Sequence, residues 1–173
     1  MKITMRLSAL ALAALLFAAS GAQAAPAQIS YDATDLGGGQ WEYIYTVSNF
    51  TLPAPIEEFT IWFELGSFAQ LMAASQDPVA AQWDELVVQP DPVLTDDGFY
   101  DALATGAGIA PGASFAGFTV HFDWLGEGDP GAQLFEIINP DTFETLYSGQ
   151  TVPEPATLSL LVVGGLTLLR RRH

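Results

Sequence analysis

Stretches in which apolar and polar side chains alternate limit most strongly how this chain can fold. In QWEYIYTVS, residues 40–48, every second side chain is large and apolar, which is the period of a β-strand with one buried face. EEFTIWFEL, residues 57–65, repeats the pattern with phenylalanine and isoleucine on one side. A third strand follows the Pro-Gly turn in IAPGASFAGFTVHFDW, residues 109–124. The chain therefore contains at least three strands that each bury one face.

Weaker strand patterns fill the intervals, at residues 28–32, 85–89, 98–104, 132–140 and 143–149. Proline and glycine separate these seven or eight strands, and no long helical pattern lies between them. We expect the strands at 40–48 and 57–65 to pair as antiparallel neighbours, and a helical turn around Leu71 and Met72. The pattern predicts an all-β fold, an antiparallel β-sandwich of the immunoglobulin-like or jelly-roll-like kind.

The charges are distributed very unevenly. The 173 residues include five Lys and Arg and twenty Asp and Glu, and all five cations are in the terminal segments, at Lys2, Arg6 and 170–172. Between residues 25 and 152 there is no Lys or Arg, and all acids except Glu154, nineteen in number, lie there. Phosphate backbones would be repelled, which excludes nucleic acid as a partner. The absence of cysteine excludes disulfides, thiolate zinc sites and a cysteine nucleophile.

The N-terminus has the pattern of a signal peptide. MKITMR carries two cations, LSALALAALLFAA is an apolar run of the right length, and Ala22-Gln23-Ala24 is a small-x-small cleavage site. We expect signal peptidase to cleave after Ala24, so that residues 1–24 are removed on export across the inner membrane. The alternative is an uncleaved membrane anchor, although the run is shorter than the ~20 residues that a spanning helix needs.

The C-terminus has the pattern of a short membrane span. Residues 156–169 are fourteen in number and carry no charge, which as a helix gives a rise of ~21 Å. Arg170, Arg171 and Arg172 follow and would stay on the cytoplasmic side. We expect a single transmembrane helix at 156–169 with a basic tail at 170–173. The alternative, a terminal helix of the domain, is disfavoured because apolar side chains cover all faces of this segment.

Val152, Pro153, Glu154 and Pro155 precede this span. The two prolines favour an extended backbone, which we expect to be exposed at the membrane edge. With the glycine pair at 164–165 and the terminal arginines, residues 152–173 closely resemble the PEP-CTERM sorting signal of exported bacterial proteins. The resemblance implies recognition by an exosortase, removal of the helix, and delivery to the cell surface or an exopolysaccharide matrix. His173, where a further basic residue is frequent, is a minor departure.

The remaining domain, residues 25–151, lacks a recognisable catalytic motif. His121 is its one histidine, and combining it with Ser48 or Ser114 gives no nucleophile-elbow pattern. We interpret His121 as a structural or solvated residue and expect no enzymatic activity. The open alternative is a secreted hydrolase that uses paired carboxylates, such as Asp84-Glu85 or Asp96-Asp97, across a cleft.

Metal binding is a second alternative, because the domain has no Lys or Arg to balance its carboxylates and cations must come from solvent. Asp91, Asp96, Asp97 and Asp101 lie in PDPVLTDDGFYD, and glycine-containing loops of this kind can place carboxylates around Ca²⁺. Their spacing matches neither an EF-hand nor a glycine-aspartate repeat. The competing interpretation is a solvated acidic surface.

Trp62 differs from the other tryptophans. Its neighbours on the same strand face are Thr60 and Glu64, so it should point away from the phenylalanine stripe. An exposed indole there would favour ligand stacking. We therefore predict a non-enzymatic exported surface or matrix protein, sorted by exosortase and associated with exopolysaccharide or biofilm. A carbohydrate- or calcium-binding module and a secreted hydrolase are the alternatives.

Overall fold

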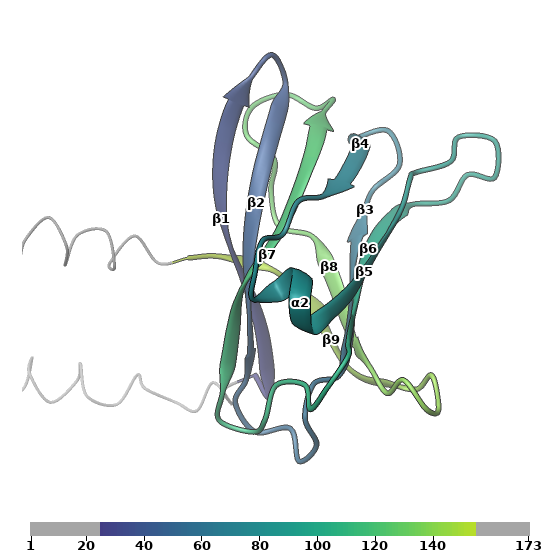
Figure 1. Ribbon diagram of the computed structural model, residues 1–173. Helices are drawn as coiled ribbons and strands as arrows, with labels where there is room; N and C mark the ends of the chain where they lie inside the picture. The colour runs from purple at the N-terminus through teal and green to yellow at the C-terminus, as the bar shows by residue number, and fades with distance from the viewer. Residues whose placement is uncertain (1–24, 155–173) are drawn as a thin grey trace, which may run out of the picture.

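The computed structural model describes residues 25–154, which form two β-sheets packed face to face (Figure 1). The all-β sandwich predicted from the sequence is confirmed. The predicted signal peptide at 1–24, the transmembrane helix at 156–169 and the basic tail at 170–173 lie outside the described residues. Within residues 25–154, no helix has the length and apolar character needed to cross a membrane.

Each sheet has five strands. The first sheet has the order β10-β1-β2-β7-β4 and the second the order β5-β6-β3-β8-β9. β10 runs parallel to β1, and the other pairings between strands of the described chain are antiparallel, so the first sheet is mixed. The elements are β1 (Ala27–Gly37), β2 (Gln40–Asn49), β3 (Glu58–Phe63), β4 (Phe68–Ala73), α2 (Val79–Gln82), β5 (Trp83–Val88), β6 (Gly98–Ala104), β7 (Ser114–Trp124), β8 (Leu134–Ile138), β9 (Thr145–Gln150) and β10 (Val152–Pro153).

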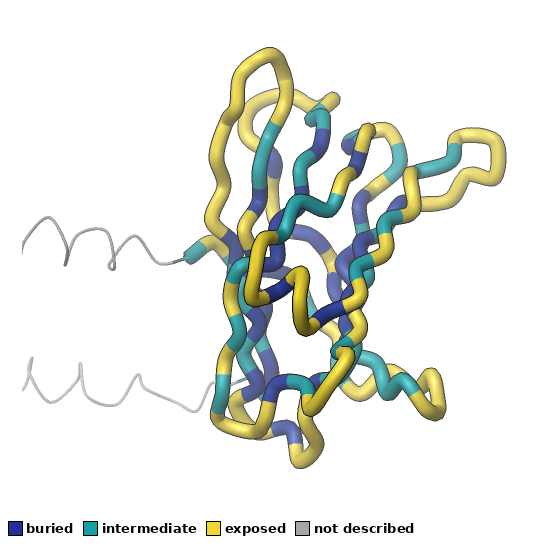
Figure 2. The backbone as a smooth tube through the Cα atoms, in the orientation of Figure 1, coloured by how far each residue is buried: buried dark blue, intermediate teal, exposed yellow. Residues whose placement is uncertain are grey.

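The buried residues lie between the two sheets (Figure 2). Many of the buried side chains are aromatic. Tyr43 and Tyr45 of β2, in the first sheet, and Phe59 and Phe63 of β3, in the second, are all completely buried. Phe59 contacts Phe118 of β7 edge to face, with ring centroids 4.9 Å apart. The alternation seen in the sequence thus decides which side of each strand meets the opposite sheet.

Two expectations about neighbouring elements are wrong. β2 and β3 do not pair; they belong to opposite sheets, because the connection through Pro53 and Pro55 crosses from one sheet to the other. Residues around Leu71 and Met72 form β4 instead of a helical turn. β4 contains a bulge where Gln70 has a φ of 52°, and this bulge removes the simple alternation from its sequence.

Candidate functional site

Trp62 lies on the outer face of the second sheet. Its neighbours along β3, Ile61 and Phe63, are fully buried, while the indole is half-buried and faces outward. Phe99, its cross-strand partner on β6, covers part of it, with ring centroids 5.4 Å apart and planes at 62°. Val88 of β5 pairs in turn with Phe99. The structure therefore places Trp62 where the sequence predicted it, within an apolar row that crosses three strands.

Three surface hollows meet at Trp62. The largest, about 590 Å³, lies between Trp62, Phe99 and the β5–β6 loop. A second, about 400 Å³, extends over β8 and β9 past Leu134 and Gln150. A third, about 290 Å³, opens toward Glu64 and Gln133. We call the row of Val88, Phe99, Trp62 and Leu134 the Trp62 platform, because the hollows follow it across the sheet.

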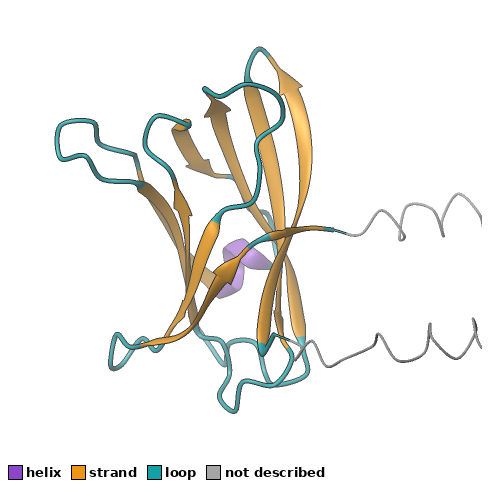
Figure 3. Ribbon diagram, turned by 180° about the vertical axis from the view of Figure 1, so that it is seen from behind, coloured by secondary structure: helices purple, strands orange, loops and turns teal. Residues whose placement is uncertain are grey.

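Two loops project on the same side of the molecule as this outer face (Figures 1 and 3). The β5–β6 loop exposes 87% of Val93 and 66% of Leu94 at its tip. The β8–β9 connection exposes 80% of Phe143, which has a φ of 58°. An extended ligand that lies across the sheet would thus meet apolar contacts beyond the platform as well as on it.

Carboxylates surround the platform. Asp97 Oδ1 accepts the Leu65 N–H at 2.8 Å, and Glu64 Oε2 accepts the Ser67 hydroxyl at 3.1 Å. Farther along the same face, Asp101 accepts the Thr60 hydroxyl at 2.7 Å. Burial raises the pKa of Asp101, although the bond from Thr60 opposes this shift. Burial, and secondarily the charge of Asp101, also raises the pKa of Glu58.

The four aspartates predicted as calcium ligands do not form a cluster. Asp91 and Asp96 exchange backbone hydrogen bonds at the base of the β5–β6 loop, at 2.9 and 3.1 Å. The Asp101 carboxylate instead accepts the Thr60 hydroxyl on the neighbouring strand of the second sheet. Among residues 25–154, no group of three or more His, Cys, Asp or Glu side chains is placed to hold a metal ion. Backbone pairing of the loop, which the sequence did not reveal, holds Asp91 and Asp96 opposite each other at its base, and both line a hollow together with Asp97, while Asp101 lies farther along the sheet.

His121 lies on the outer face of the first sheet, away from the platform. Its Nε2 is 2.8 Å from Glu42 Oε2 on the neighbouring strand. Ser48 and Ser114 bond each other at 2.7 Å, six residues farther along β2, or about 20 Å at strand spacing. The Ser-His combination considered from the sequence is therefore not assembled.

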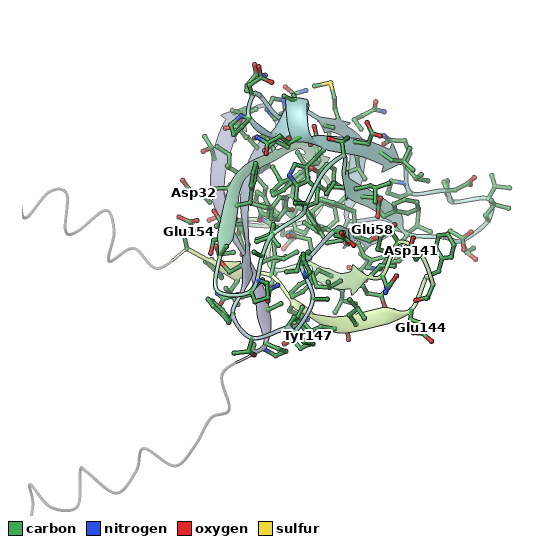
Figure 4. The ribbon with its side chains drawn as sticks, turned by 60° about the horizontal axis from the view of Figure 1, so that its bottom comes forward. Asp32, Glu58, Asp141, Glu144, Tyr147 and Glu154 are labelled. Atoms are coloured by element: carbon green, nitrogen blue, oxygen red, sulfur yellow. The ribbon has the colours of Figure 1, made fainter. Side chains whose placement is uncertain are left out.

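Residues 152–154, the start of the segment that resembles a sorting signal, are docked on the domain. Val152 and Pro153 form β10, and Glu154 donates its N–H to the Tyr31 carbonyl at 2.8 Å. The Glu154 carboxylate accepts hydroxyls from Thr46 at 3.1 Å and Ser30 at 3.4 Å. Figure 4 shows Glu154 and Asp32 on the same edge of the molecule. The backbone is extended as predicted, but it is paired to β1 rather than free, because the edge of β1 offers unused hydrogen-bonding groups.

The sequence did not identify the partners of Trp62. Phe99 and Val88 lie on strands that the sequence located without assigning their faces. The alternation of Phe99 with Tyr100, which is completely buried, was the available signal.

No protein-family model matches the chain, and no curated protein matches it. Among solved structures, the chitin-binding domain of Chi18aC from Streptomyces coelicolor is 19% identical with a TM-score of 0.41, covering 63% of this chain and 89% of that chain. A family 3b carbohydrate-binding module from Clostridium clariflavum is 8% identical with a TM-score of 0.41, covering 70% and 94%. A GH20 exo β-N-acetylglucosaminidase from Vibrio harveyi is 8% identical with a TM-score of 0.38, covering 76% of this chain and 18% of that one. At these identities and TM-scores, none of the similarities assigns a ligand or an activity to this chain.

Proposed function

We propose that residues 25–154 form a non-enzymatic polysaccharide-binding domain that uses the Trp62 platform. The observation that carries this proposal is the meeting of three hollows at one outward, half-buried indole. A pyranose ring presents an apolar C–H face that stacks on an indole and hydroxyls that bond to polar groups around it. Gln150, Glu136 and Asp97 supply such groups next to Trp62.

The protein is, in this proposal, exported and then sorted to the cell surface or an exopolysaccharide matrix. The terminal segments support export and sorting through their resemblance to a signal peptide and a PEP-CTERM signal. A polysaccharide-binding face on the exported domain would hold it within such a matrix. Signal peptidase and an exosortase are the processing partners.

Binding to a panel of polysaccharides tests the proposal. The full chain is compared with Trp62→Ala and with Met72→Ala, which removes a half-exposed apolar side chain from the first sheet. We expect retention on at least one polysaccharide, lost in Trp62→Ala and kept in Met72→Ala. Equal retention of all three proteins would contradict the assignment of the platform, and release of reducing sugar during the assay would favour the hydrolase.

A further inference from the structure

The carboxylates around the Trp62 platform point to the chemical class of the polysaccharide. Each hollow that meets at Trp62 is lined by at least one carboxylate: Asp91, Asp96 and Asp97 in the largest, Glu136 in the second, and Glu64 with Asp97 in the third. The apolar row that would stack on sugar rings is therefore flanked by negative charge on several sides.

No cationic side chain of the domain balances this charge. Residues 25–154 contain no Lys or Arg, and their one histidine, His121, lies on the opposite sheet beside Glu42. Some of the carboxylates that line the hollows accept hydrogen bonds from uncharged backbone N–H groups. Asp97 accepts the N–H of Leu65, and Asp91 accepts the N–H of Val93 at 2.7 Å. Within the described chain, the Glu136 side chain accepts no hydrogen bond. The compensating cations must come from outside the domain.

We infer that the platform selects a polysaccharide with free amino groups, a polymer of unacetylated hexosamine. This inference rests on the proposed function and adds the class of ligand to it. Such a polymer carries an apolar ring face for Trp62 and an ammonium group on each residue for the carboxylates, while a uronic acid polymer would be repelled. Because the ammonium groups repeat along the chain, several weak ion pairs act together with one stacking contact.

The test compares three oligosaccharides of equal length: a glucosamine oligomer, its fully N-acetylated counterpart and a uronic acid oligomer. Binding to the full chain in mild detergent is measured by calorimetry at low and high salt. We expect at least tenfold tighter binding of the free amine than of the acetylated oligomer at low salt, with the difference shrinking at high salt. Trp62→Ala should weaken the binding of both the free-amine and the acetylated oligomer.

Charge variants separate the platform from the general negative charge of the domain. Glu136→Gln removes a carboxylate next to the platform that accepts no hydrogen bond within residues 25–154, and Asp32→Asn removes an exposed carboxylate from β1 of the first sheet. Glu136→Gln should weaken binding of the amine oligomer about 2- to 5-fold and leave the acetylated one unchanged. Asp32→Asn should change neither. Equal losses in the two variants would mean diffuse attraction and would overturn the inference.

The outcomes distinguish this inference from the proposed function. Equal, Trp62-dependent affinity for the amine and acetylated oligomers would overturn the inference and keep the polysaccharide site. Tighter binding of the uronic acid oligomer in calcium would overturn it in favour of metal bridging. If the chain binds none of the three oligosaccharides and no polysaccharide of the panel, both the inference and the proposed function are wrong.

Discussion

The docking of Glu154 predicts that this residue, which the sequence assigns to a predicted processing signal, stabilises the folded domain. Glu154→Ala removes a carboxylate that accepts the hydroxyls of Thr46 and Ser30. The N–H of residue 154 can still bond Tyr31, so the change isolates the side chain. The variant should therefore be less stable than the native chain.

The size of the effect follows from the two bonds. A hydrogen bond to a charged group contributes about 1.5–3 kcal/mol when it is well formed and buried. Here one bond is 3.4 Å long and Glu154 is half-exposed, which reduces its contribution. We expect a loss of about 1 kcal/mol, which for a domain of this size lowers Tm by roughly 3–5 °C.

The assay is thermal unfolding of the full chain, with Glu127→Ala as the control because Glu127 is an exposed glutamate in the loop after β7. Hydrogen exchange of the Glu154 amide is measured in parallel, since β10 pairing should protect it. A Glu154→Ala midpoint within 1 °C of that of Glu127→Ala, with rapid exchange at residue 154, would refute the docked geometry.

Three further predictions concern the core, the pH response and metals. Phe59→Ala, at a fully buried ring between Trp83 and Phe118, should cost about 3–5 kcal/mol in urea unfolding, whereas Leu103→Ala on the outer face should cost far less. Because burial raises the pKa of Asp101, folding favours its protonated form, and this contribution is lost as the pH rises through the folded-state pKa. Asp101→Asn should therefore raise Tm at neutral pH and lose that advantage below the ordinary aspartate pKa; an equal gain at every pH would contradict this cause. Calcium should shift Tm no more than magnesium at equal ionic strength, since the described aspartates form no metal group, and a calcium-specific shift would reverse that conclusion.

The strands and the direction of Trp62 could be predicted because both depend on local alternation. Tyr43 and Phe59 are buried because each lies on the apolar side of a strand, and the alternation of apolar and polar residues around them shows this side in the sequence. Trp62 occupies the opposite phase of the same period and therefore faces outward.

The pairing of the strands depends on contacts between distant parts of the chain and was not predictable in the same way. β4 lacks a clean alternation because of the bulge at Gln70, and β10 is too short to give a pattern. The platform requires Phe99 and Trp62 to be cross-strand partners, although they are 37 positions apart in the sequence. Pairing register, which decides such contacts, is set by the whole sheet.

The most direct test of the central claim is an NMR titration that follows the tryptophan indole N–H signals with the bound oligosaccharide. Trp62 is the one that lies in the proposed site, while Trp83 is buried and Trp124 bonds the Gly128 carbonyl at 2.9 Å near the first sheet. We predict that the Trp62 signal, assigned by its loss in Trp62→Phe, shifts on titration while those of Trp83 and Trp124 stay in place. A saturable shift of the Trp124 signal with none at Trp62 would place the ligand on the first sheet and contradict the account.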